Sequence, residues 1–230
     1  MKTVSGVSCV DAWQAAVTQL AVNTAADEYN LLVEIRDPTR LDTSWLQAYS
    51  PQRVGANDKI GSVVNTVFPY RLSHRCGTRS EFYDRYMRIY RRAVRGTWGT
   101  YFGRLVAFGA GRQNQLETAI EKLTSWQTRS RAAIVMHLSS PEIDTMRPRG
   151  QPCWQFAELT RPNENELDLV AVCRNHDYLG KALGNFIGLG QLLQFVCVQT
   201  NLVPGRLICH SIHAYNSGTK EQLSRLARFR

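Results

Sequence analysis

Residues 154–198 read WQFAELTRPNENELDLVAVCRNHDYLGKALGNFIGLGQLLQFVCV, and they carry the strongest structural signal in the chain. Two apolar segments of strand length, Trp154–Leu159 and Leu167–Cys173, are joined by a polar loop that contains Pro162. Such a pair predicts two strands in a hairpin. The segment Leu183–Val198 is too apolar for a surface helix, so we expect a helix that runs through the core. Strands grouped beside a core helix, without strict alternation, predict an α+β fold.

The rest of the chain adds elements of both kinds. Apolar residues at helical spacing follow the potential cap Ser8 and predict a helix from about Cys9 to Val22. The polar, irregular segment Thr39–Lys59 indicates a functional or mobile loop. The apolar segment Ile60–Phe68 fits either a helix or a strand. Strands are also expected at Leu31–Ile35, Ala132–Leu138 and Leu207–Ile212, and helices at Ser80–Val94, Gln113–Trp126 and Glu221–Arg230.

Composition and length are those of an ordinary globular protein. The chain has 230 residues, of which 43% are hydrophobic and 20% are charged. We therefore expect one domain that spans residues 1–230. No segment approaches the ~20 apolar residues that a membrane-spanning helix needs. The first residues include Lys2 but build no apolar signal segment, so we expect a cytoplasmic protein without membrane contact.

The cysteines do not form a recognised metal or redox motif. None of the 6 belongs to a Cys-x-x-Cys pair, which argues against a zinc ribbon. The group Cys209, His210 and His213 matches the spacing of no common site, so we expect no bound metal. Other cysteines lie in apolar segments, where small buried side chains are expected: Cys9, Cys173 and Cys197.

The formal net charge of +9 implies an anionic partner. Nucleic acid and a phosphorylated small molecule both fit this charge. Arginines gather on the predicted helix around residue 88, which is usually a solvated face and sometimes a nucleic-acid footprint. Nucleic-acid binding is therefore the weaker expectation. The cluster comprises Arg85, Arg88, Arg91, Arg92 and Arg95.

One cysteine stands out as a candidate nucleophile. Cys153 directly follows Pro152, and the segments around it are rich in arginine. A thiolate is a strong nucleophile, and a nearby positive field favours it over the thiol. This chemistry is that of a covalent catalyst acting on an anionic substrate.

Several segments between Trp98 and Asn216, taken in order, resemble the thymidylate synthase and pyrimidine-nucleotide hydroxymethylase family. The tripeptide Gln151–Cys153 resembles its nucleophile motif, and Arg174–Asp177 with Asn185 keeps the spacing of its phosphate-to-base segment. The short chain and its Glu34–Pro38 turn resemble the compact members of the family. The other matching segments are Trp98–Gly103, Gln113–Leu123, Arg129–Val135, Pro204-Gly205 and His213–Tyr215.

The resemblance implies a mixed β-sheet covered by helices, and a homodimer through the sheet face with shared active sites. It implies that 5,10-methylenetetrahydrofolate, or a related reduced pterin, donates one carbon to C5 of a pyrimidine nucleoside 5′-monophosphate. Cys153 would add as a thiolate to C6 and turn C5 into a carbon nucleophile. We expect dUMP as substrate, because the Asn185 amide matches O4 and N3–H of uracil, whereas aspartate there would favour cytosine.

The resemblance also implies roles for the surrounding residues. Arg174 would bind the 5′-phosphate with Arg131 of the other subunit, because a guanidinium matches phosphate oxygens and stays charged. The same charge is expected to lower the pKa of the Cys153 thiol. Asp177 would act in catalysis and contact the pterin, and Tyr101 would order the water that carries the C5 proton. The other expected contacts are Asn175, His213 and Tyr215 to the nucleotide, the last two at the ribose, and Trp98 to the cofactor.

The chain departs from the family pattern in four places. Ala132 stands where a second phosphate-binding arginine is expected, with Arg129 as the alternative, and Trp154 stands where histidine usually follows the nucleophile. The catalytic glutamate has no secure match: its best placement is near Asn65, with Glu81 as another carboxylate. The segment that closes the site in standard members is expected to be missing after Asn216. An open site would let water capture the intermediate and give a hydroxymethyl product.

Other functions stay open at this point. One is hydroxymethylation of CMP or dCMP in a modified-nucleoside pathway. Another is a non-catalytic relative that binds a nucleotide or RNA, which the basic charge, Ala132 and the unmatched glutamate favour. An unrelated α+β protein is the remaining possibility. The sequence does not decide the base, the sugar, or whether a methyl or a hydroxymethyl group is transferred.

Overall fold

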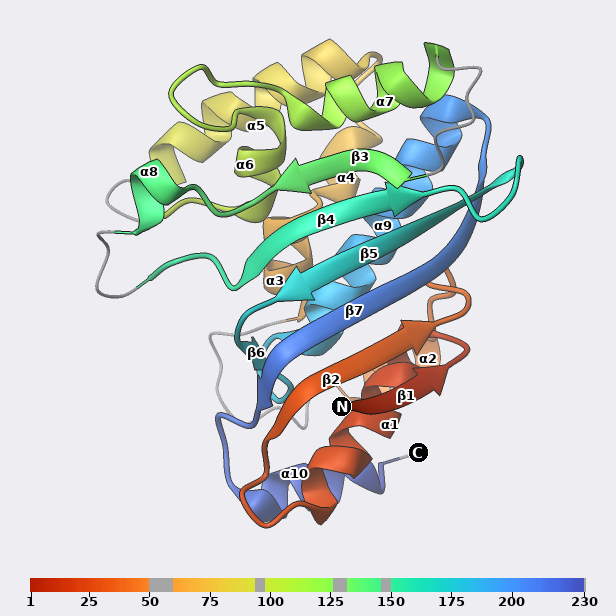
Figure 1. The fold of residues 1–230 in the computed structure, drawn as a ribbon, viewed down its shortest axis with the longest axis vertical. Coiled ribbons are helices and arrows are strands. Elements are labelled where there is room, and N and C mark those ends of the chain that lie inside the picture. The colour runs from red at the N-terminus through yellow and green to blue at the C-terminus, as the bar shows by residue number, and fades with distance from the viewer. Residues whose placement is uncertain (50–59, 94–97, 126–131, 146–149, 230) are drawn as a thin grey trace.

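One mixed β-sheet crosses the whole molecule (Figure 1). The computed structural model describes residues 1–49, 60–93, 98–125, 132–145 and 150–229, and it leaves out the side chains of residues 91–93 and 132–133. The 7-stranded sheet has the order β1-β2-β7-β5-β4-β3, and β6 pairs with β7. The expected α+β class is confirmed. The strands are β1 (Lys2–Gly6), β2 (Glu28–Ile35), β3 (Ala132–His137), β4 (Trp154–Thr160), β5 (Glu166–Cys173), β6 (His176–Asp177) and β7 (Val203–Tyr215).

Neighbouring strands run in both directions. The pairs β1/β2, β5/β7 and β6/β7 are parallel, whereas β2/β7, β4/β5 and β3/β4 are antiparallel. The predicted hairpin is therefore confirmed as β4 and β5. The strand predicted at Leu207–Ile212 is longer than expected, because β7 pairs with β2 on one side and with β5 on the other.

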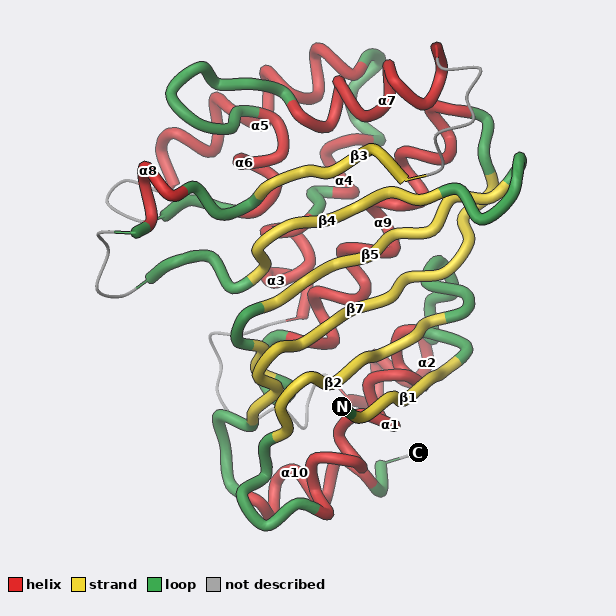
Figure 2. Tube along the Cα trace, in the orientation of Figure 1, coloured by secondary structure: helices red, strands yellow, loops and turns green. Residues whose placement is uncertain are grey.

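The helices gather on one face of the sheet and at its two ends (Figure 2). In Figure 1, α9 passes behind β5 and β7, while no described helix covers the face toward the viewer. The helices are α1 (Cys9–Val22), α2 (Thr43–Tyr49), α3 (Ile60–Val67), α4 (Tyr70–Ser73), α5 (Arg79–Ala93), α6 (Tyr101–Val106), α7 (Gln115–Ser125), α8 (Pro141–Asp144), α9 (Ala182–Thr200) and α10 (Lys220–Ala227).

Helix α9 is the predicted core helix, and its small residues allow a close contact with α3. A Cβ atom added at Gly184 would lie 2.7 Å from Val63 Cβ, and one added at Gly188 would lie 2.7 Å from Val67 Cβ. The undecided segment Ile60–Phe68 is thus helical, with its valines packed on α9. Among the described helices, α9 alone is long and apolar enough to cross a membrane, but 72% of its apolar window is buried inside the protein, as in a core helix.

The start of the chain confirms one prediction and corrects another. Ser8 caps α1 through a capping box with Asp11, as the cap position predicts. The segment Thr39–Lys59 was expected to be irregular, but its first part contains α2. Trp45 and Tyr49 are one helical turn apart, and their rings pack against Trp13 at 5.7 and 5.5 Å between centroids. Burial of these rings against α1 overrides the weak local pattern. Residues 50–59 lie outside the described residues.

Candidate active site

Cys153 and Arg174 are held together by the pairing of β4 with β5. Cys153 is half-buried immediately before β4, and Arg174 is exposed immediately after β5. The backbone N–H of Arg174 donates to the Cys153 carbonyl oxygen at 2.9 Å. The guanidinium donates to the carbonyl oxygens of Pro152 at 3.2 Å and Gln151 at 3.3 Å. The predicted nucleophile and the predicted phosphate ligand therefore share one local structure.

The surroundings of Cys153 act on its pKa in opposite directions. Burial raises the pKa of the thiol, Arg174 and Lys181 lower it, and the Asp177 carboxylate raises it further. The net pKa is above its ordinary value, because burial outweighs the positive charges. The arginine is placed as the sequence predicts, yet the lowered pKa expected from it is not found in the free protein.

Tyr101 lies at the start of α6, where it reaches the nucleophile segment. The ring is 92% buried, and its hydroxyl oxygen accepts a long hydrogen bond from the backbone N–H of Trp154 at 3.5 Å. Its ring packs against Trp98 at 4.8 Å and against Trp154 at 5.4 Å between centroids. Burial raises the pKa of the Tyr101 phenol, so the hydroxyl keeps its proton and can donate it in a hydrogen bond.

A buried ion pair that the sequence patterns did not reveal supports this wall of the site. Arg104 donates to the Asp144 carboxylate at 2.5 and 2.8 Å, and the two side chains are 8% and 6% exposed. Arg104 also donates to the backbone oxygen of Trp98 at 3.0 Å. The Gln151 amide donates to the backbone oxygen of Asp144 at 2.9 Å. The pair thus connects the Trp98 segment with the segment that carries Cys153.

Asp177 lies in β6, where it is buried, and its carboxylate is held by hydrogen bonds, including one from the segment that follows β7. The Ser217 hydroxyl donates to Asp177 Oδ2 at 2.8 Å, and the Leu179 N–H donates to Oδ1 at 3.1 Å. A Cβ at Gly180 would lie 2.3 Å from Asp177 Oδ2, so only glycine leaves room for the carboxylate. Burial first, and then the charges of Asp177 and Cys153, raise the pKa of Tyr215, which places all three groups near one another.

His213 joins a second polar group on the neighbouring strands. Its Nδ1 lies 2.8 Å from Asn175 Oδ1, and its Nε2 lies 3.4 Å from Asp27 Oδ2. The ring stacks between Tyr29 at 4.7 Å and Tyr215 at 5.6 Å. Asn175, His213 and Tyr215 are thus brought together as expected. Asp27 and Tyr29 were missed, because nothing in their local sequence marks them.

Asn185 lies on the first turn of α9 and is buried beside a histidine. Its Nδ2 lies 3.1 Å from His176 Nε2, and the other ring nitrogen of His176 lies 2.9 Å from Ser211 Oγ. The exposed fractions of Asn185 and His176 are 6% and 1%. Sequence patterns drew attention to Asn185 but not to His176, whose partners come from α9 and β7.

The other predicted positions lie outside the described residues or have contacts apart from those given above. Arg131 and Arg129 lie outside the described residues, as do the side chain of Ala132 and the whole of Arg95. Asn65 is exposed on α3. Glu81 is exposed near the start of α5, where its carboxylate accepts a hydrogen bond from the backbone N–H of Gly77 at 2.9 Å. Arg88 is exposed on the same helix, as a solvated face requires.

The cysteine expectations are met in part. Cys9, Cys173 and Cys197 are each 1% exposed. The group Cys209, His210 and His213 does not converge: adjacent residues of a strand point to opposite faces, and His210 Nε2 contacts Asn30 Oδ1 at 3.1 Å on the other side.

Comparison with known proteins identifies what this arrangement is similar to. No family model matches the chain. It is 32% identical over 105 residues to a protein of Methanococcoides burtonii named "Putative thymidylate synthase", and 30% identical over 105 residues to one of the same name from Methanosarcina barkeri. Each alignment covers 46% of this chain and 46% of the relative, so the chain spans about half the length of these curated relatives.

The fold is similar to a solved structure over nearly the whole chain. Thymidylate synthase from T4 phage matches with a TM-score of 0.59 and 14% sequence identity, over 95% of this chain and 80% of the other. At this identity the match shows the fold alone. The resemblance drawn from the motifs is confirmed in sequence and in fold.

Proposed function

We propose that this chain, thymidylate synthase-like in sequence and in fold, transfers a one-carbon unit to C5 of a pyrimidine nucleoside 5′-monophosphate, with dUMP as the preferred substrate. The observation that carries the proposal is the pairing of Cys153 with Arg174 through the 2.9 Å backbone hydrogen bond. This bond supports the proposal because it keeps the thiol and the guanidinium together where β4 begins and β5 ends. The product would carry a methyl group if the reduced folate also supplies a hydride, or a hydroxymethyl group if water adds instead.

The chemical step begins at Cys153. The thiol would release its proton to water, and its sulfur would form a bond to C6 of the pyrimidine. The electrons of the C5–C6 double bond would move to C5, where they form the bond to the one-carbon unit. Tyr101 keeps its proton because burial raises its pKa. Its hydroxyl is therefore suited to hold the water that receives the C5 proton later in the reaction. Asp177 is a described carboxylate whose charge acts on Cys153, raising the pKa of its thiol.

Nucleotide binding would use the polar groups on either side of the nucleophile. Arg174 would bind the phosphate, joined by Arg131 of a second subunit, since paired guanidinium groups match phosphate oxygens. His213 and Tyr215 would contact the ribose, with Asn175 and Asp27 fixing the His213 ring. Asn185 would read the base edge.

The residues near Asp177 fit a reduced pterin. A pterin presents N–H groups, and the Asp177 carboxylate, held by Ser217, is an acceptor for them. Trp98 is half-buried and adds a flat aromatic surface beside Tyr101. Bound 5,10-methylenetetrahydrofolate would supply the one-carbon unit. Asp177 and Trp98 would hold it, while Cys153 and Tyr101 act on the pyrimidine.

We also propose a homodimer through the uncovered face of the sheet, acting in the cytoplasm. Val170 and Ile208 pair across β5 and β7 on this face and are half-buried, although no described helix covers them. Val135 is 43% exposed and Ile212 is 40% exposed. An apolar sheet face of this kind favours a partner. A dimer would also supply Arg131 to the opposite site.

A covalent trap tests the proposed reaction. The nucleotide 5-fluoro-dUMP and 5,10-methylenetetrahydrofolate should together form a covalent adduct on Cys153, because fluorine cannot leave C5 as a proton does. Cys153→Ser should lose the adduct. Cys76→Ser is the matched control, since Cys76 is also a half-buried free thiol, and it should keep the adduct. If no adduct forms under any folate condition, covalent catalysis is wrong.

Two alternatives are separated by the same measurement. The first is a cytosine substrate. The contact with His176 can hold the Asn185 amide in either orientation, so CMP and dCMP stay candidate substrates. An adduct with 5-fluoro-dCMP and none with 5-fluoro-dUMP would favour them. The exposed Asn65 in place of a catalytic glutamate favours a non-catalytic nucleotide- or RNA-binding relative. Saturable nucleotide binding without any adduct would select that function.

A further inference from the structure

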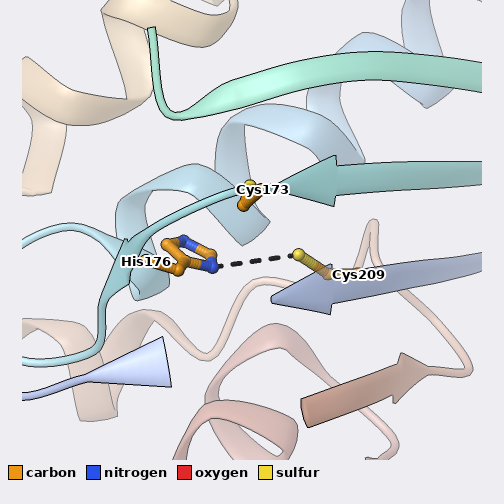
Figure 3. A group of neighbouring side chains, drawn as sticks. All are labelled: Cys173, His176 and Cys209. Carbon is orange, nitrogen blue, oxygen red and sulfur yellow. Dashed lines mark hydrogen bonds between the residues drawn. The ribbon is translucent and has the colours of Figure 1, made fainter. Parts of the chain in front are cut away.

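Two thiols and an imidazole converge in the core directly beneath the candidate active site (Figure 3). They are Cys173, His176 and Cys209, and one ligand atom from each lies within 4.8 Å of the other two. Cys209 Sγ is 3.9 Å from His176 Nδ1. The residues are 1%, 1% and 0% exposed, and both cysteines are free thiols. Sulfur and imidazole nitrogen are the donors that zinc prefers.

The sheet register explains why these residues meet although no sequence motif joins them. In the parallel pair β5/β7, Ala171 lies opposite Cys209 and Cys173 lies opposite Ser211. The two cysteines are therefore diagonal neighbours on the face covered by α9. The chain then turns into β6, where His176 lies opposite Ala214 of the same strand β7.

We propose that Cys173, His176 and Cys209 form a zinc site. On binding, each thiol releases its proton, and two thiolate–zinc bonds and one imidazole–zinc bond form. Zn²⁺ with two thiolates and a neutral imidazole has no net charge, so the assembled site avoids the large cost of placing an isolated ion in the core. Zinc stays in one oxidation state, and the step needs no oxidant or reductant.

The groups around the histidine support this assignment. Ser211 Oγ lies 2.9 Å from His176 Nδ1, the nitrogen that faces Cys209, so an oxygen stands beside the proposed metal position. With zinc on Nδ1, the other nitrogen, Nε2, would carry the proton and donate it to the Asn185 side chain, 3.1 Å away, once the amide turns its oxygen toward the ring. A metal-binding histidine usually has its second nitrogen fixed in this way. Phe186 packs edge-on against the ring at 5.7 Å and limits its rotation.

The proposed site differs from the sequence-based expectation of no metal, which considered Cys209 with His210 and His213. Its place in the fold indicates its role. Cys173 directly precedes Arg174, and His176 contacts Asn185. Zinc would therefore tie β5, β6 and β7 together beneath two residues that are proposed to bind the nucleotide. The metal itself is proposed as a structural site.

The test measures metal content and coordination of the full chain, expressed with zinc supplied and freed of loosely bound metal. We expect one zinc per chain by elemental analysis, and two sulfurs with at least one imidazole nitrogen by X-ray absorption at the zinc edge. Replacement by Co²⁺ should give thiolate-to-cobalt charge-transfer bands. A folded wild-type protein that binds no zinc, or zinc bound through oxygen and nitrogen only, would overturn the proposal.

Variants locate the metal and control for folding. Cys173→Ala and Cys209→Ala should each lose the charge-transfer bands, with circular dichroism used to confirm that they fold. Cys197→Ala is the matched control, since Cys197 is also 1% exposed but lies in α9 outside the group. It should keep the zinc, and so should Cys153→Ala. Zinc lost from Cys153→Ala would instead place the metal on the candidate nucleophile. The wild-type measurement decides the matter even where a variant fails to fold.

This outcome is independent of the proposed catalytic activity. The 5-fluoro-dUMP adduct is measured on the same preparation. An adduct on a protein that binds no zinc would support the transferase proposal and contradict the zinc site. Zinc binding without an adduct would support the zinc site and contradict the transferase proposal.

Discussion

Asn185 and His176 are hydrogen-bonded in the core, with 3.1 Å between Nδ2 and Nε2. The imidazole can accept or donate at this nitrogen, depending on which nitrogen carries its proton. A proton on Nε2 would hold the Asn185 carbonyl oxygen and leave the amide N–H groups for the substrate. A proton on Nδ1, donated toward Ser211, would leave the carbonyl oxygen instead. The protonation of His176 therefore decides which half of the Asn185 amide stays free for a ligand.

Replacing the amide should change the base preference. In Asn185→Asp, the carboxyl group no longer offers both an N–H donor and an acceptor, and we expect a shift from dUMP toward dCMP. Each mismatched buried polar contact costs about 1–3 kcal/mol, which corresponds to roughly a 5- to 150-fold change in relative kcat/KM. Competition between the two nucleotides for adduct formation measures the change. An unchanged ratio would show that Asn185 does not read the base.

The reactivity of Cys153 should increase with pH. Burial raises the pKa of this thiol above its ordinary value, so the thiolate is a minor species near neutral pH. Below the pKa, the thiolate fraction grows about tenfold per pH unit, and the increase should continue beyond a pH of about 8.5. The alkylation rate of Cys153 in the free protein, followed by mass spectrometry, measures it. A plateau near neutral pH would contradict the raised pKa.

Two charge variants should move this pH profile in opposite directions. The Lys181 charge lowers the pKa of Cys153 and the Asp177 charge raises it. Lys181→Gln should therefore slow alkylation at a given pH, and Asp177→Asn should accelerate it. The same sign for both variants would show that a structural change, and not the charge, is responsible.

Removing Asp144 should destabilise the protein strongly. The Arg104–Asp144 pair is buried, and Asp144→Ala would leave the guanidinium charge without its partner. We expect a loss of about 3–5 kcal/mol in the free energy of unfolding, measured with denaturant. Glu34→Gln is the matched control, because the Arg206–Glu34 pair is exposed and should be worth less than about 1 kcal/mol. Equal losses in the two variants would show that burial of the first pair carries no extra cost.

The contact between α3 and α9 can be tested with two glycine variants. Gly188→Ala places a methyl group 2.7 Å from Val67 Cβ, and we expect a loss of about 1–3 kcal/mol in the free energy of unfolding. Gly61→Ala, in the exposed part of α3, meets nothing within 4 Å. It should stabilise the helix by about 0.5–1 kcal/mol. Thermal unfolding of both variants measures the difference, and a stable Gly188→Ala would contradict the close helix contact.

Local patterns predicted most of the elements of this fold. The Ser8 cap, the β4/β5 hairpin and the apolar helix α9 each depend on residues a few positions apart, and the structure contains all three. Helix α2 was missed because its stability comes from the packing of Trp45 and Tyr49 against Trp13, and that contact joins distant segments.

The features of the candidate site also fall into those that local sequence predicts and those that depend on contacts between distant segments. The amino-acid sequence by itself determined which chemical groups are available, because the motifs around Cys153, Arg174 and Asn185 supply a thiol, a guanidinium and an amide. Only the tertiary structure decided that Asp144 balances Arg104, that Ser217 holds Asp177, and that Cys173, His176 and Cys209 share one buried volume. Those contacts depend on strand register and on helix packing across the whole sheet, and no short segment of the chain encodes them.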